Sequence, residues 1–154
     1  MPITALLRIA LVCLAGASTA ASAANAAPDR SGDGEAAFRE LYKELVETNT
    51  TLSSGNCTLA AERMAARLKA AGYRDEELRV FFVPEHPKEG GLVAELKGSD
   101  ARRRPVLLLA HIDVVEAKRA DWVRDPFTLI EEDGYFYGRG AADDKAMAAV
   151  FTDL

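Results

Sequence analysis

The sequence is poor in the residues that form covalent cross-links or bind polyanions. Its 154 residues include 2 cysteines and 2 histidines, and 24 acidic side chains outnumber 19 basic ones, which gives a formal net charge of −5. A chain without excess positive charge cannot neutralise many phosphates or anionic lipid headgroups. We therefore expect no nucleic-acid partner and no binding to membrane surfaces.

Long apolar runs are absent beyond residues 1–26. Within that stretch, residues 9–17 are apolar and Arg8 is the only charged side chain. The run is shorter than the ~20 residues of a membrane-spanning helix, and small residues that a signal peptidase reads follow it. The pattern predicts a secretory signal over 1–26 with cleavage after Ala23 or Ala26. We therefore expect an exported protein, periplasmic or extracellular, with no membrane attachment after cleavage.

The shortage of cysteine argues against an intrachain disulfide. Cys13 would leave with the signal, so the mature protein would keep only Cys57. A lone cysteine can be a reactive thiol or a zinc ligand, but Cys57 has no second ligand at the spacing of a metal motif. We interpret Cys57 as a small packing residue.

Nucleotide-binding and serine-hydrolase motifs are also missing. A phosphate-binding loop requires Gly-Lys followed by Ser or Thr, whereas Lys145 lies between Asp144 and Ala146. The dinucleotide fingerprint fails because Asp143 occupies the place of its third glycine. No Gly-x-Ser-x-Gly elbow is present.

The remaining patterns predict two helices at the start of the mature chain. A polar linker is expected over 27–34, and the apolar spacing of an amphipathic helix follows at Phe38, Leu41, Tyr42, Leu45 and Val46. We expect a second helix with Thr58 as its N-cap and its end at Gly72. Its predicted inner face consists of Leu59, Met64, Leu68 and Ala71.

Short β-rich runs begin at residue 78. We expect strands over 78–83, 92–96 and 106–110, separated by Pro, Gly and charged residues. Residues 106–110 are apolar without alternation, which is typical of a central strand covered on both faces.

A hairpin and a third helix are expected near the end of the sequence. Residues 127–130 and 135–137 flank an Asp133-Gly134 pair that suits a tight turn. The helix begins near Asp143 and carries Met147, Val150 and Phe151 at helical spacing. The fold class expected is therefore α/β, with a mixed sheet flanked by helices.

His111 and Asp113 directly follow the predicted strand 106–110. They occupy alternate positions, so their side chains would face the same side of an extended chain. A neutral imidazole binds zinc, and a carboxylate beside its other ring nitrogen fixes the tautomer. Taken alone, the pair is more typical of a hydrogen-bonded histidine at the end of a strand.

Asp143 and Asp144 follow a Gly138-Arg139-Gly140 stretch and lie at a helix start. Adjacent residues cannot both point at one spot in a regular helix, so one carboxylate could bind metal while the other faces elsewhere. The alternative is acidic capping of a surface helix. Arg139 could contact a substrate or pin this loop, and we favour the second role.

Three segments together resemble a known family of di-zinc metallopeptidases and amidohydrolases. The family includes acetylornithine deacetylase, succinyl-diaminopimelate desuccinylase, glutamate carboxypeptidase and aminoacylase. The segments are residues 107–115, which contain His111 and Asp113, residues 122–127, and residues 133–145, which contain Asp143 and Asp144. Their order and spacing are highly specific, and a looser similarity to exported members covers most of the mature chain.

The resemblance implies a role for each residue. His111 would bind one zinc, Asp143 would bridge both zincs, and Asp113 would be the catalytic residue that orients His111. Asp144 would lie outside the ligand set, joined to Asp143 by a cis peptide bond. Two zincs, for which cobalt or manganese could substitute, would activate a shared water and polarise the scissile amide carbonyl.

The resemblance also implies what these residues do not supply. The general-base glutamate and the remaining carboxylate and histidine ligands have no counterpart before Leu154, and His86 is expected to be a surface residue. We assign Trp122, Pro126 and Phe127 to packing. We therefore expect residues 35–154 to be the truncated N-terminal part of a catalytic domain, inactive alone.

The function implied is hydrolysis of a peptide or N-acyl amino acid amide bond, as in a carboxypeptidase, dipeptidase or deacylase. In the family, a second domain for dimerisation or for use as a lid sets much of the substrate choice. A homodimeric full-length protein is compatible with the resemblance. The alternative is a truncated, non-catalytic α/β module that binds or regulates a partner.

Overall fold

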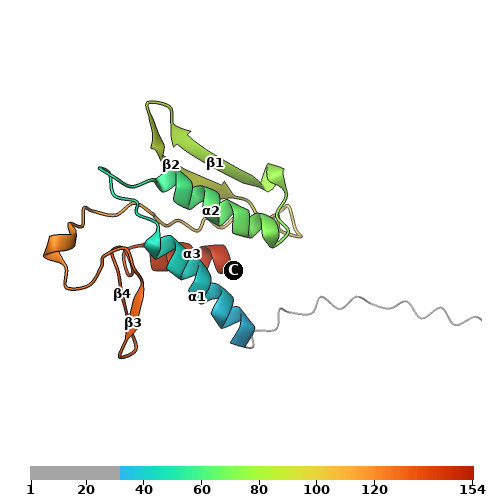
Figure 1. Cartoon of the computed structure of the whole chain (residues 1–154). Helices are drawn as coiled ribbons and strands as arrows, with labels where there is room; N and C mark the ends of the chain where they lie inside the picture. Colours follow the sequence, from blue (N-terminus) through green and yellow to red (C-terminus); the bar gives the residue numbers. More distant parts are fainter. Residues whose placement is uncertain (1–31) are drawn as a thin grey trace, which may run out of the picture.

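Residues 32–154 are described by the computed structural model, so the predicted signal over 1–26 and residues 27–31 lie outside the described part. Helices and strands are both present, which confirms the α/β class (Figure 1). Within the described range, no helix is both long and apolar enough to cross a membrane. The elements are α1 (Gly32–Glu47), α2 (Cys57–Ala70), η1 (Asp75–Glu77), β1 (Leu78–Val83), β2 (His86–Ala94), η2 (Arg119–Asp121), β3 (Ile130–Glu132), β4 (Tyr135–Tyr137) and α3 (Lys145–Asp153).

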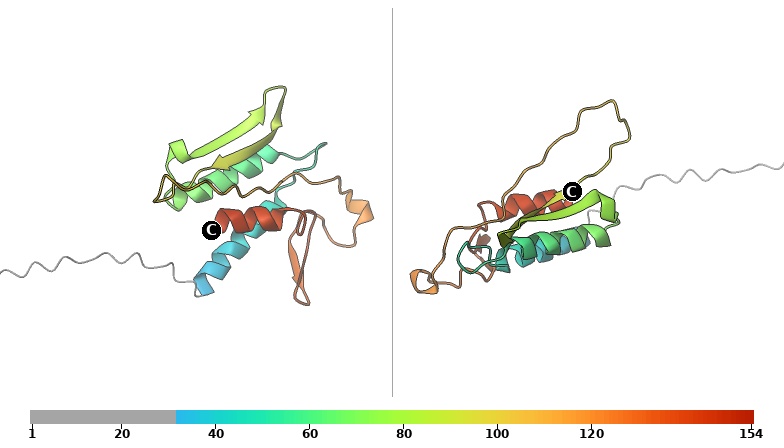
Figure 2. Two further views of the ribbon diagram at one scale, coloured as in Figure 1. Left: turned by 180° about the vertical axis from the view of Figure 1, so that it is seen from behind. Right: turned by 90° about the horizontal axis from the view of Figure 1, so that it is seen from above.

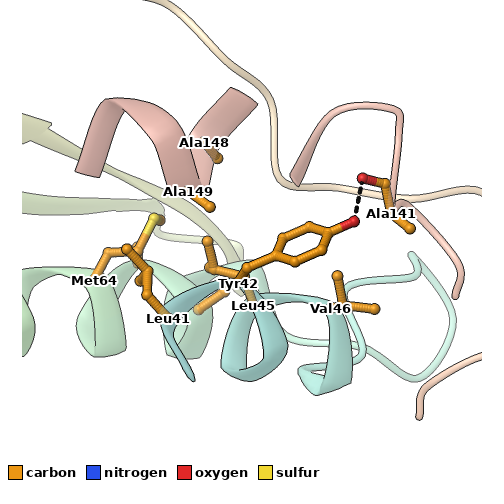
Figure 3. Close-up of a cluster of buried hydrophobic side chains, with 10 residues drawn as sticks. Leu41, Tyr42, Leu45, Val46, Met64, Ala141, Ala148 and Ala149 are labelled. Atoms are coloured by element: carbon orange, nitrogen blue, oxygen red, sulfur yellow. Dashed lines mark hydrogen bonds between the residues drawn. The ribbon is translucent and has the colours of Figure 1, made fainter. Parts of the chain in front are cut away.

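The core lies between the three helices. α1 begins at Gly32, inside the residues predicted as a linker. Its apolar stripe is buried as expected, except for Phe38, which is half-buried. Figure 3 shows this stripe meeting side chains of α2 and α3, with Tyr42 reaching across to Ala141. The buried cluster consists of Leu41, Tyr42, Leu45, Val46, Ala60, Ala61, Met64, Ala141, Ala148 and Ala149.

The second helix is confirmed, but its N-cap and part of its inner face differ from the prediction. Asn56 is the N-cap because its side-chain oxygen accepts a hydrogen bond from Leu59 N at 2.8 Å. The hydroxyl of Thr58 instead donates to the Pro87 carbonyl at 2.7 Å, which ties α2 to β2. Met64 and Leu68 are buried, whereas Leu59 and Ala71 are exposed.

β1 and β2 form an antiparallel hairpin that packs on α2 (Figure 1). β1 has the predicted bounds of 78–83, and Leu78 pairs with Ala94. β2 covers His86–Ala94 rather than the predicted 92–96, so Pro, Gly and charged residues that were expected to separate two strands are part of β2. The His86 side chain is exposed, as expected of a surface residue.

The prediction of a central strand over 106–110 is wrong for the described residues. Residues 104–113 have no regular secondary structure, and Val106 and Leu107 are 84% and 82% exposed. Figure 2 shows the chain near residue 100 as a loop that projects from the body. A strand requires a hydrogen-bonded neighbour, and the four strands of the described range pair within their own hairpins. Two small antiparallel sheets therefore take the place of the expected mixed sheet.

The predicted hairpin around Asp133-Gly134 is confirmed, with its first strand displaced from 127–130 to Ile130–Glu132. Its turn has φ angles of +52° at Asp133 and +79° at Gly134. Positive φ at both central residues is the geometry of a two-residue hairpin turn, for which Asp-Gly is a favoured pair. Asp133 and Gly134 therefore form the tight turn that the sequence predicted.

α3 completes the core with only one of its faces. Ala148 and Ala149 are buried, whereas Met147 and Val150, two of the residues that indicated the helix, are exposed. A cleft of about 1150 Å³ lies beside the helix and is lined by Phe151, β2 and residues 106–114. Residues 106–110, which were predicted as a central strand, thus line this cleft together with Met64 and Leu68 of α2.

Candidate metal centre

His111 lies in an extended segment that a short threonine-rich stretch holds in place. The Thr50 hydroxyl donates to the Ile112 carbonyl at 2.6 Å, and Val114 N donates to the Thr50 carbonyl at 3.2 Å. A parallel bridge between Thr51 and Val114 continues this pairing. The backbone on the C-terminal side of His111 is therefore fixed to the residues that follow α1.

Asp143 and Asp144 lie in a tight loop before α3. The loop closes where Lys145 N donates to the Gly140 carbonyl at 3.2 Å, and Gly140 has a φ of +78° that favours glycine. The peptide bond between Asp143 and Asp144 is cis, as the family resemblance implied. The loop thus presents two successive carboxylates at the start of a helix.

These two segments bring His111 and Asp143 together across 32 positions of sequence. His111 Nε2 lies 3.0 Å from Asp143 Oδ1. The other ring nitrogen, Nδ1, lies 3.2 Å from the Asp113 carboxylate and 3.2 Å from the Asp113 backbone carbonyl. The predicted convergence is present, whereas metal ligation by these side chains stays a prediction.

Asp144 contacts the backbone of His111. One of its carboxylate oxygens accepts a hydrogen bond from His111 N at 3.4 Å, and the side chain makes no capping bond to α3. Acidic helix capping therefore does not account for this pair. Asp144 instead links the backbone of the His111 segment to the loop that carries Asp143.

The charges around His111 favour its protonated form in the metal-free chain. The hydrogen bond with Asp143 raises the pKa of His111 above its ordinary value, and Asp113 acts in the same direction, while slight burial opposes both. A metal ligand must be neutral imidazole, so a bound metal would displace this proton. A proton and a metal ion would therefore compete for Nε2.

The residues present fit half of a zinc site. His nitrogen and Asp oxygen are ordinary zinc ligands, and two donors on one tetrahedral zinc lie about 3.3–3.6 Å apart. A small separation of His111 and Asp143 from 3.0 Å would admit the ion, and their side chains are 52% and 89% exposed. Within residues 32–154, no group of three or more His, Cys, Asp or Glu side chains is arranged to hold a metal ion.

The other predicted candidates lie elsewhere. Cys57 is half-buried, and burial raises the pKa of its thiol, which disfavours a reactive thiolate and agrees with a packing role. Arg139 stacks its guanidinium 4.9 Å from the centre of the Trp122 ring, and its backbone N donates to the Pro126 carbonyl at 2.6 Å. These contacts pin the loop, which is the role that we favoured for Arg139.

Lys145 is a residue whose importance the sequence did not indicate. Its side chain is 0% exposed, and its Nζ donates to the Thr48 carbonyl at 2.7 Å. Burial lowers the pKa of Lys145 to about 8, so the ammonium is still charged at neutral pH. Its position directly after two aspartates was the available signal, but sequence alone does not distinguish a buried lysine from a solvated one.

Comparisons with known proteins agree with the resemblance. Residues 107–154 match the family profile described as "Peptidase family M20/M25/M40". The chain is 50% identical over 65 residues, or 42% of its length, to the human N-fatty-acyl-amino acid synthase/hydrolase PM20D1, and covers 13% of that protein. It is 44% identical over 90 residues, or 57% of its length, to succinyl-diaminopimelate desuccinylase of Stenotrophomonas maltophilia (strain K279a), and covers 21% of it.

A longer alignment covers most of the chain. The desuccinylase of Xanthomonas euvesicatoria pv. vesicatoria (strain 85-10) is 38% identical over 115 residues, which is 73% of this chain and 27% of that protein. The matched part of the chain therefore spans 13% to 27% of the length of these relatives. Because the matched segment contains His111, Asp113, Asp143 and Asp144, the chain belongs to the peptidase family M20/M25/M40.

Proposed function

We propose that this chain supplies half of a di-zinc centre that hydrolyses the amide bond of an N-acyl amino acid or a peptide. One observation carries the proposal: within the segment matched to the family, the His111 imidazole and the Asp143 carboxylate lie 3.0 Å apart. A nitrogen donor and an oxygen donor at this separation suit zinc. Cobalt or manganese would be expected to substitute for it.

Each residue of the pair has a distinct task in this proposal. His111 would hold a metal ion through its ring nitrogen, and Asp143 would supply carboxylate oxygens for the ion pair. Asp113, 3.2 Å from His111 Nδ1, fixes the ring orientation and tautomer and strengthens the imidazole as a donor. When bound, the zinc pair supplies Lewis-acid polarisation of the carbonyl and lowers the pKa of water.

The described residues alone do not support turnover. A catalytic zinc usually has three protein ligands, whereas His111 and Asp143 provide two donors. Hydrolysis also requires a base that accepts the proton of water, and loss of such a base commonly costs about 100- to 10,000-fold in rate. We therefore propose that further residues, outside 32–154, complete the centre.

The relatives support an amide substrate with a carboxylate beside it. Their names concern an N-fatty-acyl-amino acid and a succinyl-diaminopimelate. An N-acyl amino acid and a dipeptide both carry such an amide, so both classes are included in the proposal. We further propose that the protein is exported after cleavage near Ala23 or Ala26 and that the whole protein is homodimeric.

The test is an assay of the protein made from its own gene in its natural host beside the 154-residue chain. Substrates are an N-succinyl amino acid, an N-fatty-acyl amino acid and a dipeptide, each with added zinc. We expect the protein made in its natural host to lose activity with a chelator and to regain it with zinc. Asp143→Asn should abolish its activity, whereas the exposed control Asp121→Asn should not.

The 154-residue chain should show no turnover in the same assay. If the protein made in its natural host stays active with a chelator, or as Asp143→Asn, the proposed role of Asp143 as a metal ligand is contradicted. Comparable turnover by the 154-residue chain would contradict the proposal that residues outside 32–154 complete the centre.

A further inference from the structure

A buried lysine directly follows the two aspartates of the candidate metal centre in the sequence. Lys145 follows the Asp143-Asp144 pair, and its side chain is the largest that is fully buried in the described chain. Burial of an ammonium is costly unless it is hydrogen-bonded or paired. Its Nζ donates to the Thr48 carbonyl, which lies one residue beyond the C-terminal end of α1. This end of a helix carries partial negative charge, so the ammonium is stabilised there.

The same lysine closes the loop that carries Asp143. Its backbone N donates to the Gly140 carbonyl, so Asp143 and Asp144 lie between the two ends of one hydrogen-bonded loop. The Lys145 stem also packs against this loop, because a Cβ built at Gly140 would lie 3.3 Å from Lys145 Cδ. Through its Nζ, the loop is therefore anchored to Thr48.

His111 is anchored to the same short stretch of chain. Thr50, two residues after Thr48, accepts a hydrogen bond from Val114 N and donates one to the Ile112 carbonyl. Thr48, Thr50 and Thr51 are all buried, which is unusual for three polar residues so close together. We call residues 48–51 the threonine segment.

We infer that Lys145 and the threonine segment form a positioning device that sets the separation of His111 and Asp143. The inference rests on the proposed metal centre and extends it, because neither Lys145 nor Thr50 touches the candidate metal position. Lys145 holds the Asp143 loop at Thr48, and Thr50 holds the His111 segment. Both halves of the centre are thereby attached to the threonine segment, directly after α1.

A second bond supports the anchoring of the Asp143 loop. The buried Tyr42 hydroxyl on α1 donates to the Ala141 carbonyl at 2.7 Å (Figure 3). The loop is thus attached at two places, through Ala141 to α1 and through Lys145 to Thr48, directly after α1. Removal of the ammonium should therefore displace the carboxylates without unfolding the loop completely.

The test is a zinc titration of the 154-residue chain followed by NMR of the His111 ring protons, with His86 as an internal reference because the chain has 2 histidines. Lys145→Met removes the ammonium and keeps most of the stem volume, and Thr50→Val removes the hydroxyl that holds Ile112. Leu68→Ala, a buried change on α2, is the control for general loss of stability. Folding of each variant is measured by circular dichroism.

We expect Lys145→Met and Thr50→Val each to weaken zinc binding by about 10- to 100-fold, as loss of an outer-shell partner usually does. Leu68→Ala should bind zinc as the unchanged chain does. Wild-type zinc affinity in folded Lys145→Met overturns the inference. If Lys145→Met does not fold, wild-type affinity in Thr50→Val overturns it instead.

Failure of the proposed function would look different. In that case the unchanged chain would show no zinc-dependent shift at His111, or Asp143→Asn would bind zinc as tightly as the unchanged chain. Either result removes the metal centre itself, and the positioning inference with it. If zinc affinity falls in Lys145→Met and Thr50→Val but not in Leu68→Ala, the positioning inference is supported.

Discussion

Residues 41–46 of α1 and residues 106–109 are both rich in large apolar side chains, but only the first group is buried. Leu45 and Val46 are 1% and 0% exposed, whereas Val106 and Leu107 are 84% and 82% exposed. The difference follows from how each element satisfies its backbone. A helix forms its hydrogen bonds internally and needs only a surface to pack on, whereas a strand needs a neighbouring strand before its side chains can be covered.

The comparison also locates the candidate metal centre. His111 and Asp143 lie where the packed region, α1 with the threonine segment, meets the open region around 104–110. One side of the centre is fixed by buried hydrogen bonds, and the other side is open. An additional strand or ligand-bearing segment would therefore add to the open side without rebuilding the packed one.

The largest expected effect is a difference in the free energy of unfolding between substitutions in α1 and substitutions in residues 106–109. Leu45→Ala should lower the free energy of unfolding by about 2–5 kcal/mol, because it leaves a cavity in the helical core. Leu107→Ala should change it by less than about 0.5 kcal/mol, because the side chain is already in solvent. Urea unfolding followed by circular dichroism measures both. Equal losses would mean that residues 106–109 are covered in solution, for instance by self-association.

A smaller effect is expected where the two regions meet. Gly140→Ala would place a Cβ 2.5 Å from Val114 Cγ1 at a φ of +78°, so it should cost at least about 1 kcal/mol and disturb the Asp143 loop. Gly98→Ala is the matched control, since a Cβ there meets nothing within 4 Å. The same unfolding experiment applies. A neutral Gly140→Ala would show that the loop is looser than the structure describes.

Sequence reasoning succeeded where local chemistry decides structure. The periodicity of α1, the Asp133-Gly134 turn and the bounds of β1 were all readable because each depends on residues that are close in sequence. The N-cap of α2 was misplaced because Asn56 and Thr58 are both good caps, and a tertiary contact with Pro87 engages Thr58. Local propensity cannot rank two such residues.

Some residues of the candidate site could be predicted from the sequence and others could not. His111 and Asp143 could be paired in advance from motifs that resemble a family, and Asp113 lies beside His111 as expected. Lys145 and Thr50 could not be found, because their contacts with Thr48 and Ile112 span 97 and 62 positions. Nothing in the sequence around Thr50 indicates that the hydroxyls of Thr48, Thr50 and Thr51 are buried.

The most direct test of the metal centre is zinc-edge X-ray absorption of the zinc-loaded 154-residue chain, compared with His111→Ala and His86→Ala. We predict nitrogen and oxygen neighbours at about 2.0–2.2 Å, with imidazole scattering that disappears in His111→Ala and persists in His86→Ala. A sulfur neighbour at about 2.3 Å, which Cys57 would supply, or imidazole scattering that survives His111→Ala, would contradict the account.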